Sequence, residues 1–245
     1  MKTLLFLICL FTAQLNVSAQ TESFEGSLVY SRKFYDGAET IEAFDQFVTI
    51  KMKYTVKESF CLIELLGEDK LMEGRSYSMI IDSDKEEATL LAKIANKNMA
   101  VKFDTSYFNS SKLSKIISAN NRQLREIAGL TCQAGFALKE SDLGTQDTMK
   151  IWYATSYEAI PYQFENNSAP GLIVSMQQDA ISYWELTEIR KEKVEASRFI
   201  IPSAYLSVTE AEFQDYISTL DQFEIVDEEA QKEMRGNEMI HEKED

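Results

Sequence analysis

The chain has 245 residues, 44% of them hydrophobic, and its formal net charge at pH 7 is −15. The apolar content is enough for a sizeable folded core, which excludes a chain that is disordered over most of its length. The acidic balance repels phosphate backbones and anionic lipid headgroups, so nucleic-acid binding is not expected.

The first nineteen residues have the pattern of a secretory signal peptide. Lys2 supplies positive charge, "LLFLICLFTA" supplies an apolar stretch, and residues 17–19 offer a small-residue cleavage site. The apolar stretch is too short to span a bilayer, and no other stretch is long and apolar enough for a transmembrane helix. We therefore expect an exported protein, periplasmic or secreted, with residues 1–19 removed. Residues 20–225 are predicted to form a single domain, and 226–245 a disordered acidic tail.

From residue 24 onward the sequence alternates between apolar runs and turn signals. Short strands at this spacing favour a sandwich, a barrel or a curved antiparallel sheet. Residues 110–124 fit a helix or a strand equally well. Strands are predicted over residues 24–35, 47–56, 59–66, 75–82, 87–94, 98–104, 129–139, 148–154, 171–177 and 182–194.

Two of these segments carry finer predictions. In "GLTCQAGFALK" (129–139), every second residue from Leu130 to Leu138, Phe136 included, falls on one face, which predicts an antiparallel strand that buries that face. The acidic stretch "DSDKEE" (82–87) predicts a hairpin turn. Its carboxylates could hold Ca²⁺ only weakly, because the twelve-residue calcium loop is missing.

Residues 209–223 predict a C-terminal amphipathic helix. Thr209 and Glu212 have the spacing of a capping box. An apolar face follows from i, i+3, i+4, i+7 spacing, and we expect this face to pack on the sheet. The residues of the apolar face are Phe213, Tyr216, Ile217 and Leu220.

Side chains that carry common catalytic and metal chemistry are scarce. The single histidine, His241, lies in the last five residues, so it supports neither a nucleophile–histidine dyad nor a histidine-rich zinc site in an ordered core. No glycine-rich phosphate motif occurs. An enzyme that uses only carboxylates is the remaining catalytic hypothesis, but no pair of acids stands out. We therefore expect no catalytic residues, no cofactor and no metal.

Two cysteines, Cys61 and Cys132, remain once the signal peptide has taken Cys9 with it. In an oxidising compartment they can form one disulfide. The alternative is a pair of buried thiols that act as small hydrophobic residues. The sequence leaves both alternatives open.

Aromatic residues gather between positions 152 and 184. Trp152 and Tyr153 are neighbours on one predicted strand, so their side chains point to opposite faces, and the same holds for Tyr183 and Trp184. A sheet with aromatic residues on both faces must cover both, or keep one open for a ligand or partner. These four residues are candidates for the wall of an apolar ligand site, with ordinary sheet core as the alternative.

The stretch "SAPGLI" (168–173) ends a polar run and begins an apolar one. Pro170 presets φ and Gly171 can supply a positive φ, which predicts a type II turn from Ala169 to Leu172. The stretch resembles the hexapeptide that names the GLPGLI family of exported proteins, found mainly in Bacteroidota. Pro170, Gly171, Leu172 and Ile173 agree with it, and Ser168 and Ala169 depart from it.

Three further segments resemble the same family. "FEGSLVYSRKF" is similar to its first strand, and "IAGLTCQAGFAL" and "MKIWYATSYEAIP" to segments that precede the hexapeptide. A related exported family of unknown function has the same arrangement, and both are similar to LolA/LolB-like periplasmic carriers. The resemblance implies a mainly β (α+β) fold: a strongly curved, unclosed antiparallel sheet with helices over its concave side and an apolar cavity. It implies no established activity.

Two functions from different classes fit these expectations. The first is an exported, non-enzymatic binding protein that carries or senses a lipid, a lipoprotein or another apolar ligand in the cell envelope. The second is an interaction protein of the envelope with a filled core and no small ligand, whose acidic tail and helix contact a basic protein. Whether the concave face is open or filled distinguishes the two.

Overall fold

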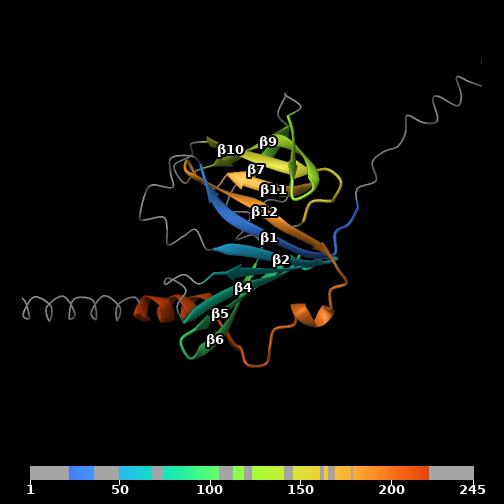
Figure 1. Ribbon diagram of the computed structural model, residues 1–245. Helices are drawn as coiled ribbons and strands as arrows, with labels where there is room; N and C mark the ends of the chain where they lie inside the picture. The colour runs from blue at the N-terminus through green and yellow to red at the C-terminus, as the bar shows by residue number, and fades with distance from the viewer. Residues whose placement is uncertain are drawn as a thin grey trace, which may run out of the picture.

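All of the strands that the structure describes belong to one large β-sheet (Figure 1). The computed structural model describes residues 22–35, 50–67, 74–104, 113–118, 123–140, 146–160, 163–164, 169–177 and 179–220. The expected signal peptide and acidic tail lie outside these residues. The elements are β1 (Gly26–Phe34), β2 (Lys51–Lys57), β3 (Phe60–Leu66), β4 (Arg75–Asp82), β5 (Glu87–Ile94), β6 (Lys97–Asp104), β7 (Leu113–Ser118), β8 (Leu124–Ile127), β9 (Leu130–Glu140), β10 (Gln146–Ala154), β11 (Leu172–Gln177), β12 (Ser182–Lys191), the 3₁₀ helix η3 (Ala196–Phe199), β13 (Leu206–Val208) and an α-helix over 210–220.

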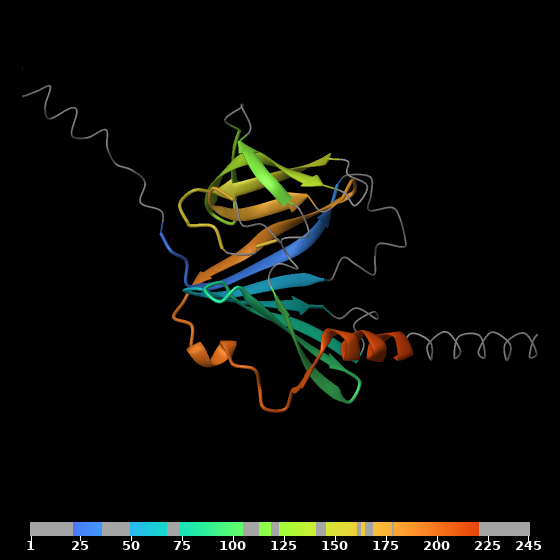
Figure 2. The ribbon, with the colours of Figure 1, turned by 180° about the vertical axis from the view of Figure 1, so that it is seen from behind.

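Twelve strands follow one another across the sheet in the order β13-β6-β5-β4-β3-β2-β1-β12-β11-β10-β9-β7, and β8 pairs with β9 off this path. Only β13 and β6 pair in parallel among the described strands. The sheet curls, with β9 and β10 at one end and β5 and β6 at the other (Figures 1 and 2). The two end strands do not pair with each other in the described part of the chain, so the sheet is unclosed. The predicted mainly β, unclosed antiparallel fold is confirmed.

The ten predicted strands are all present, with ends that shift by a few residues at most sites. The ambiguous segment 110–124 contains the strand β7 and the first residue of β8, and both strands pair with the long strand β9. The sequence did not predict η3 or β13. The latter has three residues and gains its strand geometry from pairing with β6, which no local pattern reveals.

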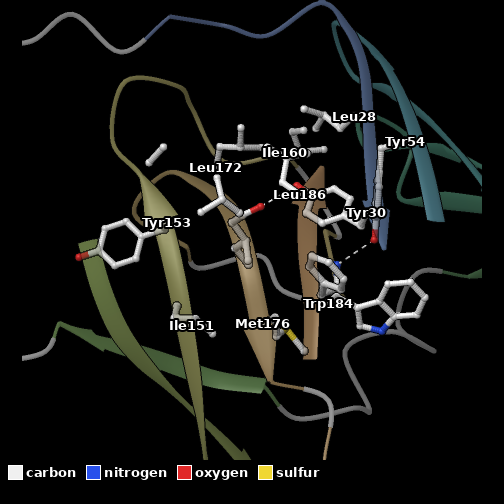
Figure 3. Close-up of a cluster of buried hydrophobic side chains, with 14 of the residues drawn as sticks. Leu28, Tyr30, Tyr54, Ile151, Tyr153, Ile160, Leu172, Met176, Trp184 and Leu186 are labelled. Carbon is white, nitrogen blue, oxygen red and sulfur yellow. Dashed lines mark hydrogen bonds between the residues drawn. The ribbon is translucent and has the colours of Figure 1, made fainter. Parts of the chain in front are cut away.

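The main core lies on one face of the strands, which we call the inner face. Tyr30 of β1, Tyr54 of β2 and Leu172 of β11 are almost fully buried in this core (Figure 3). The connection between β10 and β11 adds buried residues to the same cluster: Tyr157, Ile160 and Phe164. The inner face is therefore filled at this end of the sheet. The cavity that the family resemblance implies is not found at this place among the described residues.

The other end of the inner face is covered by the predicted C-terminal helix. The helix begins with the predicted capping box: the Glu212 N–H donates to Thr209 Oγ1 at 3.2 Å, and the Thr209 N–H donates to Glu212 Oε2 at 2.7 Å. Phe213 is buried against β5 and β6, and the other predicted apolar residues pack around it. Figures 1 and 2 both show the helix beside β5 and β6. The predicted packing is confirmed.

The face of β3–β6 opposite the inner face is covered by the chain that follows β12. Val194, Phe199 of η3 and Tyr205 lie in one cluster with apolar residues of the strands. The ring centroids of Phe60 and Phe199 are 5.4 Å apart. The strands of this half of the sheet are thus buried on both faces, which explains why their sequences read as continuous apolar runs.

The predicted burial of β9 is wrong in its second half. Phe136 is 39% exposed, whereas Gly135 and Ala137 are buried. Ala137 pairs with Met149 and Gly135 pairs with Ile151, and both partners belong to the main core. The core therefore lies on the side of the small residues, because their size leaves room for the larger side chains of β10.

The predicted type II turn at 169–172 is also wrong. Pro170 and Gly171 form a bend, and Gly171 has no positive φ. An ideal Cβ at Gly171 would instead lie 2.3 Å from the carbonyl oxygen of Ala154. Glycine is required here because the start of β11 approaches the end of β10 too closely for any side chain.

Cys61 and Cys132 are buried free thiols in the main core, which is the second of the two alternatives that the sequence left open. Burial raises the pKa of Cys61 to about 12 and that of Cys132 to about 11. Between β4 and β5, residues 83–86 form the predicted hairpin turn, and Lys85 binds the Asp82 carboxylate at 2.6 Å. In the described part of the chain, no helix has the length and apolarity needed to cross a bilayer.

Candidate functional site

A pocket of about 290 Å³ is lined by residues of β1, β8, β10, β11 and β12. Trp152 and Tyr183 both line it, although they come from different strands. Their neighbours Tyr153 and Trp184 are buried in the main core instead, as the alternation of side chains along a strand requires. The structure therefore brings two of the four predicted wall residues together in the pocket, and Trp152 also packs against the main core that holds the other two.

The pocket is assembled by the register of adjacent strands. Trp152 of β10 lies opposite Ser175 of β11, and Gln177 of β11 lies opposite Tyr183 of β12. The Gln177 side chain fixes this arrangement, since its Oε1 accepts from the Lys150 N–H at 3.1 Å. The lining residues are Phe34, Tyr35, Arg125, Lys150, Trp152, Ser175, Gln177 and Tyr183.

Aromatic rings form much of the pocket wall. The rings of Tyr35 and Tyr183 lie 4.9 Å apart between centroids, at an interplanar angle of 31°. The pKa of Tyr35 is raised, first by burial and then by its neighbours Tyr183 and Asp179. The Lys150 ammonium lies 5.2 Å from the centroid of the Trp152 ring. Flat aromatic surfaces with a cation beside them can hold a planar or apolar group.

A buried carboxylate lies beside the pocket. Glu185 of β12 is paired in register with the pocket residue Ser175, and its side chain is 7% exposed. Lys33 Nζ lies 2.5 Å from Glu185 Oε1, and the Arg125 guanidinium lies 3.2 Å from Oε2. Oε2 nevertheless accepts no hydrogen bond among the described residues, so the N–H groups of Arg125 do not point at it.

A second acid near the pocket, Asp179, is also neutralised. Its carboxylate lies 3.1 Å from Arg32 and accepts from the Ser182 hydroxyl and from two backbone N–H groups. Burial raises the pKa of Asp179, but these hydrogen bonds and Arg32 lower it by more, so that its pKa lies below the ordinary value. Asp179 is therefore ionised and paired at neutral pH.

Sequence reasoning missed most of the polar residues of the pocket. Lys150 could have been found, because it lies two residues before Trp152 and so on the same face of the strand. Gln177 reaches the pocket only through the pairing of β11 with its neighbours, which the sequence does not give. Arg125 lies on β8, in a segment for which no strand was predicted.

The described residues of the predicted family motif do not line the pocket and mostly pack in or against the main core. Leu172 and Ile173 are fully buried, Ala169 packs against the main core, and Pro170 is exposed. Gly171 makes the close approach to β10 described above. Ser168 lies outside the described residues. The described part of the motif thus contributes to the main core at the start of β11.

The described residues contain no group of three or more His, Cys, Asp or Glu side chains that could hold a metal ion. The pocket combines aromatic walls, two cations and an amide, which suits the binding of a small molecule.

No protein-family profile and no curated protein matches the chain. Solved structures of PNGF-II, one in the P21 and one in the C2 space group, are distantly similar, with TM-scores of 0.49 and 0.46 and 14% sequence identity in each case. Each alignment covers 77% of this chain and 32% of the PNGF-II chain. The similarity covers a large antiparallel sheet and assigns the chain to no family.

Proposed function

We propose that the protein is an exported, non-enzymatic binding protein that holds a small ligand in the pocket between Trp152 and Tyr183. The observation that carries this proposal is the meeting of these two aromatic residues, which lie on different strands, in one pocket of about 290 Å³. Aromatic residues are usually directed to the core, as Tyr153 and Trp184 are. Trp152 and Tyr183 line the pocket, so part of each ring surface is available to a ligand.

The pocket favours a small ligand with a planar or apolar part. Its volume is at the lower end of the range of small-molecule sites, which is roughly 300–1,000 Å³. A lipoprotein or a lipid with two acyl chains exceeds this space. Of the ligand classes expected from the sequence, the small apolar one has the best support.

Export and family membership belong to the same proposal. The signal-peptide pattern of residues 1–19 supports a periplasmic or secreted protein. The resemblance of residues 168–173 and of three other segments supports membership of the GLPGLI family or its exported relative. The curled, unclosed sheet with one C-terminal helix agrees with the fold that this resemblance implies.

Binding of a neutral planar probe tests the proposal. Saturation-transfer NMR with indole is expected to show binding to the purified protein, and Trp152→Leu and Tyr183→Leu are each expected to weaken it about tenfold. Tyr205→Leu, at an aromatic residue of the connection that covers the other half of the sheet, is the matched control and should bind indole as the parent does. Mass spectrometry of an extract of the fresh protein should identify a small molecule. Absence of indole binding and of any extracted molecule would contradict the proposal.

One observation favours the second candidate, an envelope interaction protein without a small ligand. The inner face is filled by the main core and by Tyr157, Ile160 and Phe164 from the connection after β10. Residues 221–245 contain ten acids and three bases, which suits a basic protein partner. Deletion of 226–245 should then abolish capture of that partner in a pull-down from an envelope extract, and unchanged capture would exclude a role for the tail.

A further inference from the structure

The pocket carries a positive charge in a protein that is strongly acidic. Two of its lining residues, Arg125 and Lys150, are cations, and none is an acid. The whole chain, by contrast, has 40 acidic and 25 basic residues. A cleft lined by one sign of charge concentrates ligands of the opposite sign.

The nearby acids do not cancel this charge. Glu185 contacts both Lys33 and Arg125. Together with Lys150, three cations therefore lie near this one carboxylate. Asp179, the other acid near the pocket, is paired with Arg32. An excess of positive charge therefore remains at the pocket within the described part of the chain.

Both lining cations keep hydrogen-bond donors for a ligand. The Arg125 guanidinium contacts Glu185 without a hydrogen bond, as the unsatisfied Oε2 shows. The Lys150 ammonium lies over the Trp152 ring and has no carboxylate within reach among the described residues. Arg125 and Lys150 can therefore donate charge-assisted hydrogen bonds to an anionic group that enters the pocket.

From this geometry we infer that the ligand is a small organic anion: a planar ring that lies against Trp152 and Tyr183 and bears a carboxylate or a similar acid group bound by Arg125 and Lys150. The inference rests on the proposed function and adds the charge of the ligand to it. The guanidinium gives a two-pronged donor for a carboxylate, and the ammonium adds a point charge. The ring and the acid group are held by different residues, so their contributions can be separated.

Three probes that share one ring test the inference: indole-3-acetate, the neutral indole-3-acetamide and the cationic tryptamine. Calorimetric titration of the purified protein at low salt is expected to show indole-3-acetate binding about tenfold more tightly than the amide, with tryptamine weakest. Raising the salt concentration to about 0.5 M should weaken binding of the acid and leave the amide unchanged, because only the charged contact is screened.

Variants assign the effect to the two cations. Arg125→Gln and Lys150→Gln should each weaken indole-3-acetate binding about fivefold to tenfold and leave indole-3-acetamide binding within about twofold. Lys102→Gln, an exposed lysine of β6 paired with Glu87, is the matched control and should change neither. Circular dichroism spectra that match the parent show that each variant is folded.

The two proposals fail in different ways. If the acid and the amide bind equally well, or if neither Arg125→Gln nor Lys150→Gln changes their ratio, the inferred charge preference is wrong while ring binding stands. If no member of the indole series binds, and none of the corresponding phenylacetate, phenylacetamide and phenethylamine probes binds either, both the inference and the proposed function are overturned.

Discussion

The side-chain amide of Gln163 takes the place of a strand partner for the backbone of Ile173. Its Oε1 accepts from the Ile173 N–H at 3.0 Å, and its Nε2 donates to the Ile173 carbonyl at 2.7 Å. The Tyr30 hydroxyl donates to the same carbonyl at 2.6 Å and accepts from Gln163. This network is fully buried where the pairing of β10 and β11 is irregular, so one side chain ties the connection after β10 to the motif strand.

Gln163→Leu is expected to destabilise the protein by about 2–4 kcal/mol, because it leaves the buried N–H of Ile173 without an acceptor and removes a donor to its carbonyl. Urea unfolding followed by circular dichroism measures the change in the free energy of unfolding. Gln133→Leu, at an exposed glutamine of β9, is the control and should change stability by less than about 0.5 kcal/mol. Equal effects of the two substitutions would show that the network contributes nothing.

Gly171→Ala tests the physical reason for the glycine of the motif. A Cβ at this position would lie 2.3 Å from the Ala154 carbonyl oxygen, so the end of β10 must move. We expect a loss of at least about 3 kcal/mol, at the upper end of the cost of overpacking. Gly74→Ala is the comparison: Gly74 has φ +70° and open space around it, so alanine there costs about 1–2 kcal/mol through backbone conformation alone. A smaller loss at Gly171 than at Gly74 would refute the steric explanation.

The strands were predictable because their local patterns agree with their environment. Residues 87–94 match β5 at both ends, and Thr209 with Glu212 forms the helix cap that the spacing predicts. The errors arise where tertiary packing determines which residues are buried or which side chain fits. Phe136 is exposed because the core lies on the side of Gly135 and Ala137, and Gly171 is required by the proximity of Ala154, which is seventeen positions earlier in the chain.

The candidate site was half predictable for the same reason. Alternation separates Trp152 from Tyr153 and Tyr183 from Trp184, and the structure follows that separation. The sequence could not say that Trp152 and Tyr183 share a pocket, since strand order sets this relation. It also gave no sign of Arg125, whose strand β8 lies off the main path of the sheet, and so it missed the charge of the pocket.

The two buried thiols are expected to be unreactive in the folded protein. With pKa values of about 12 for Cys61 and about 11 for Cys132, almost no thiolate is present at pH 8. Ellman's reagent should label neither cysteine in the native protein and both in guanidinium. Ser207→Cys, at an exposed position of β13, should react at once as a positive control. Rapid labelling of the native thiols would contradict their burial.

The same thiols predict how stability depends on alkaline pH. Each is an acid whose folded pKa is raised, so above an unfolded pKa of about 8.5 the folded state holds protons that the unfolded state has lost. Stability should therefore fall as the pH rises from about 9 towards 11. The slope of unfolding free energy against pH should be shallower in Cys61→Ala than in the parent; equal slopes would show that Cys61 does not contribute.

Thr209→Ala removes the helix cap and should lower the free energy of unfolding by about 1 kcal/mol. The backbone N–H of Glu212 loses its acceptor, and the reciprocal bonds to the Glu212 carboxylate are weakened. Amide hydrogen exchange should become faster in residues 210–213 and remain unchanged in β1 and β12. Thr209→Ser keeps the hydroxyl and is expected to behave like the parent, so a loss of the same size in this variant would point to a cause other than the cap.

Glu185→Gln tests how the carboxylate beside the pocket affects both the stability of the protein and the binding of an anionic ligand. The change keeps the shape of the side chain and removes a carboxylate that Lys33 and Arg125 share. We expect a loss of about 1 kcal/mol in stability, since both cations are about half exposed and solvent screens them. Calorimetry should show tighter binding of indole-3-acetate by a few-fold, with indole-3-acetamide unchanged, because the charge that opposes the ligand has gone. Weaker binding of the acid would mean that Glu185 serves chiefly to hold Arg125 in place.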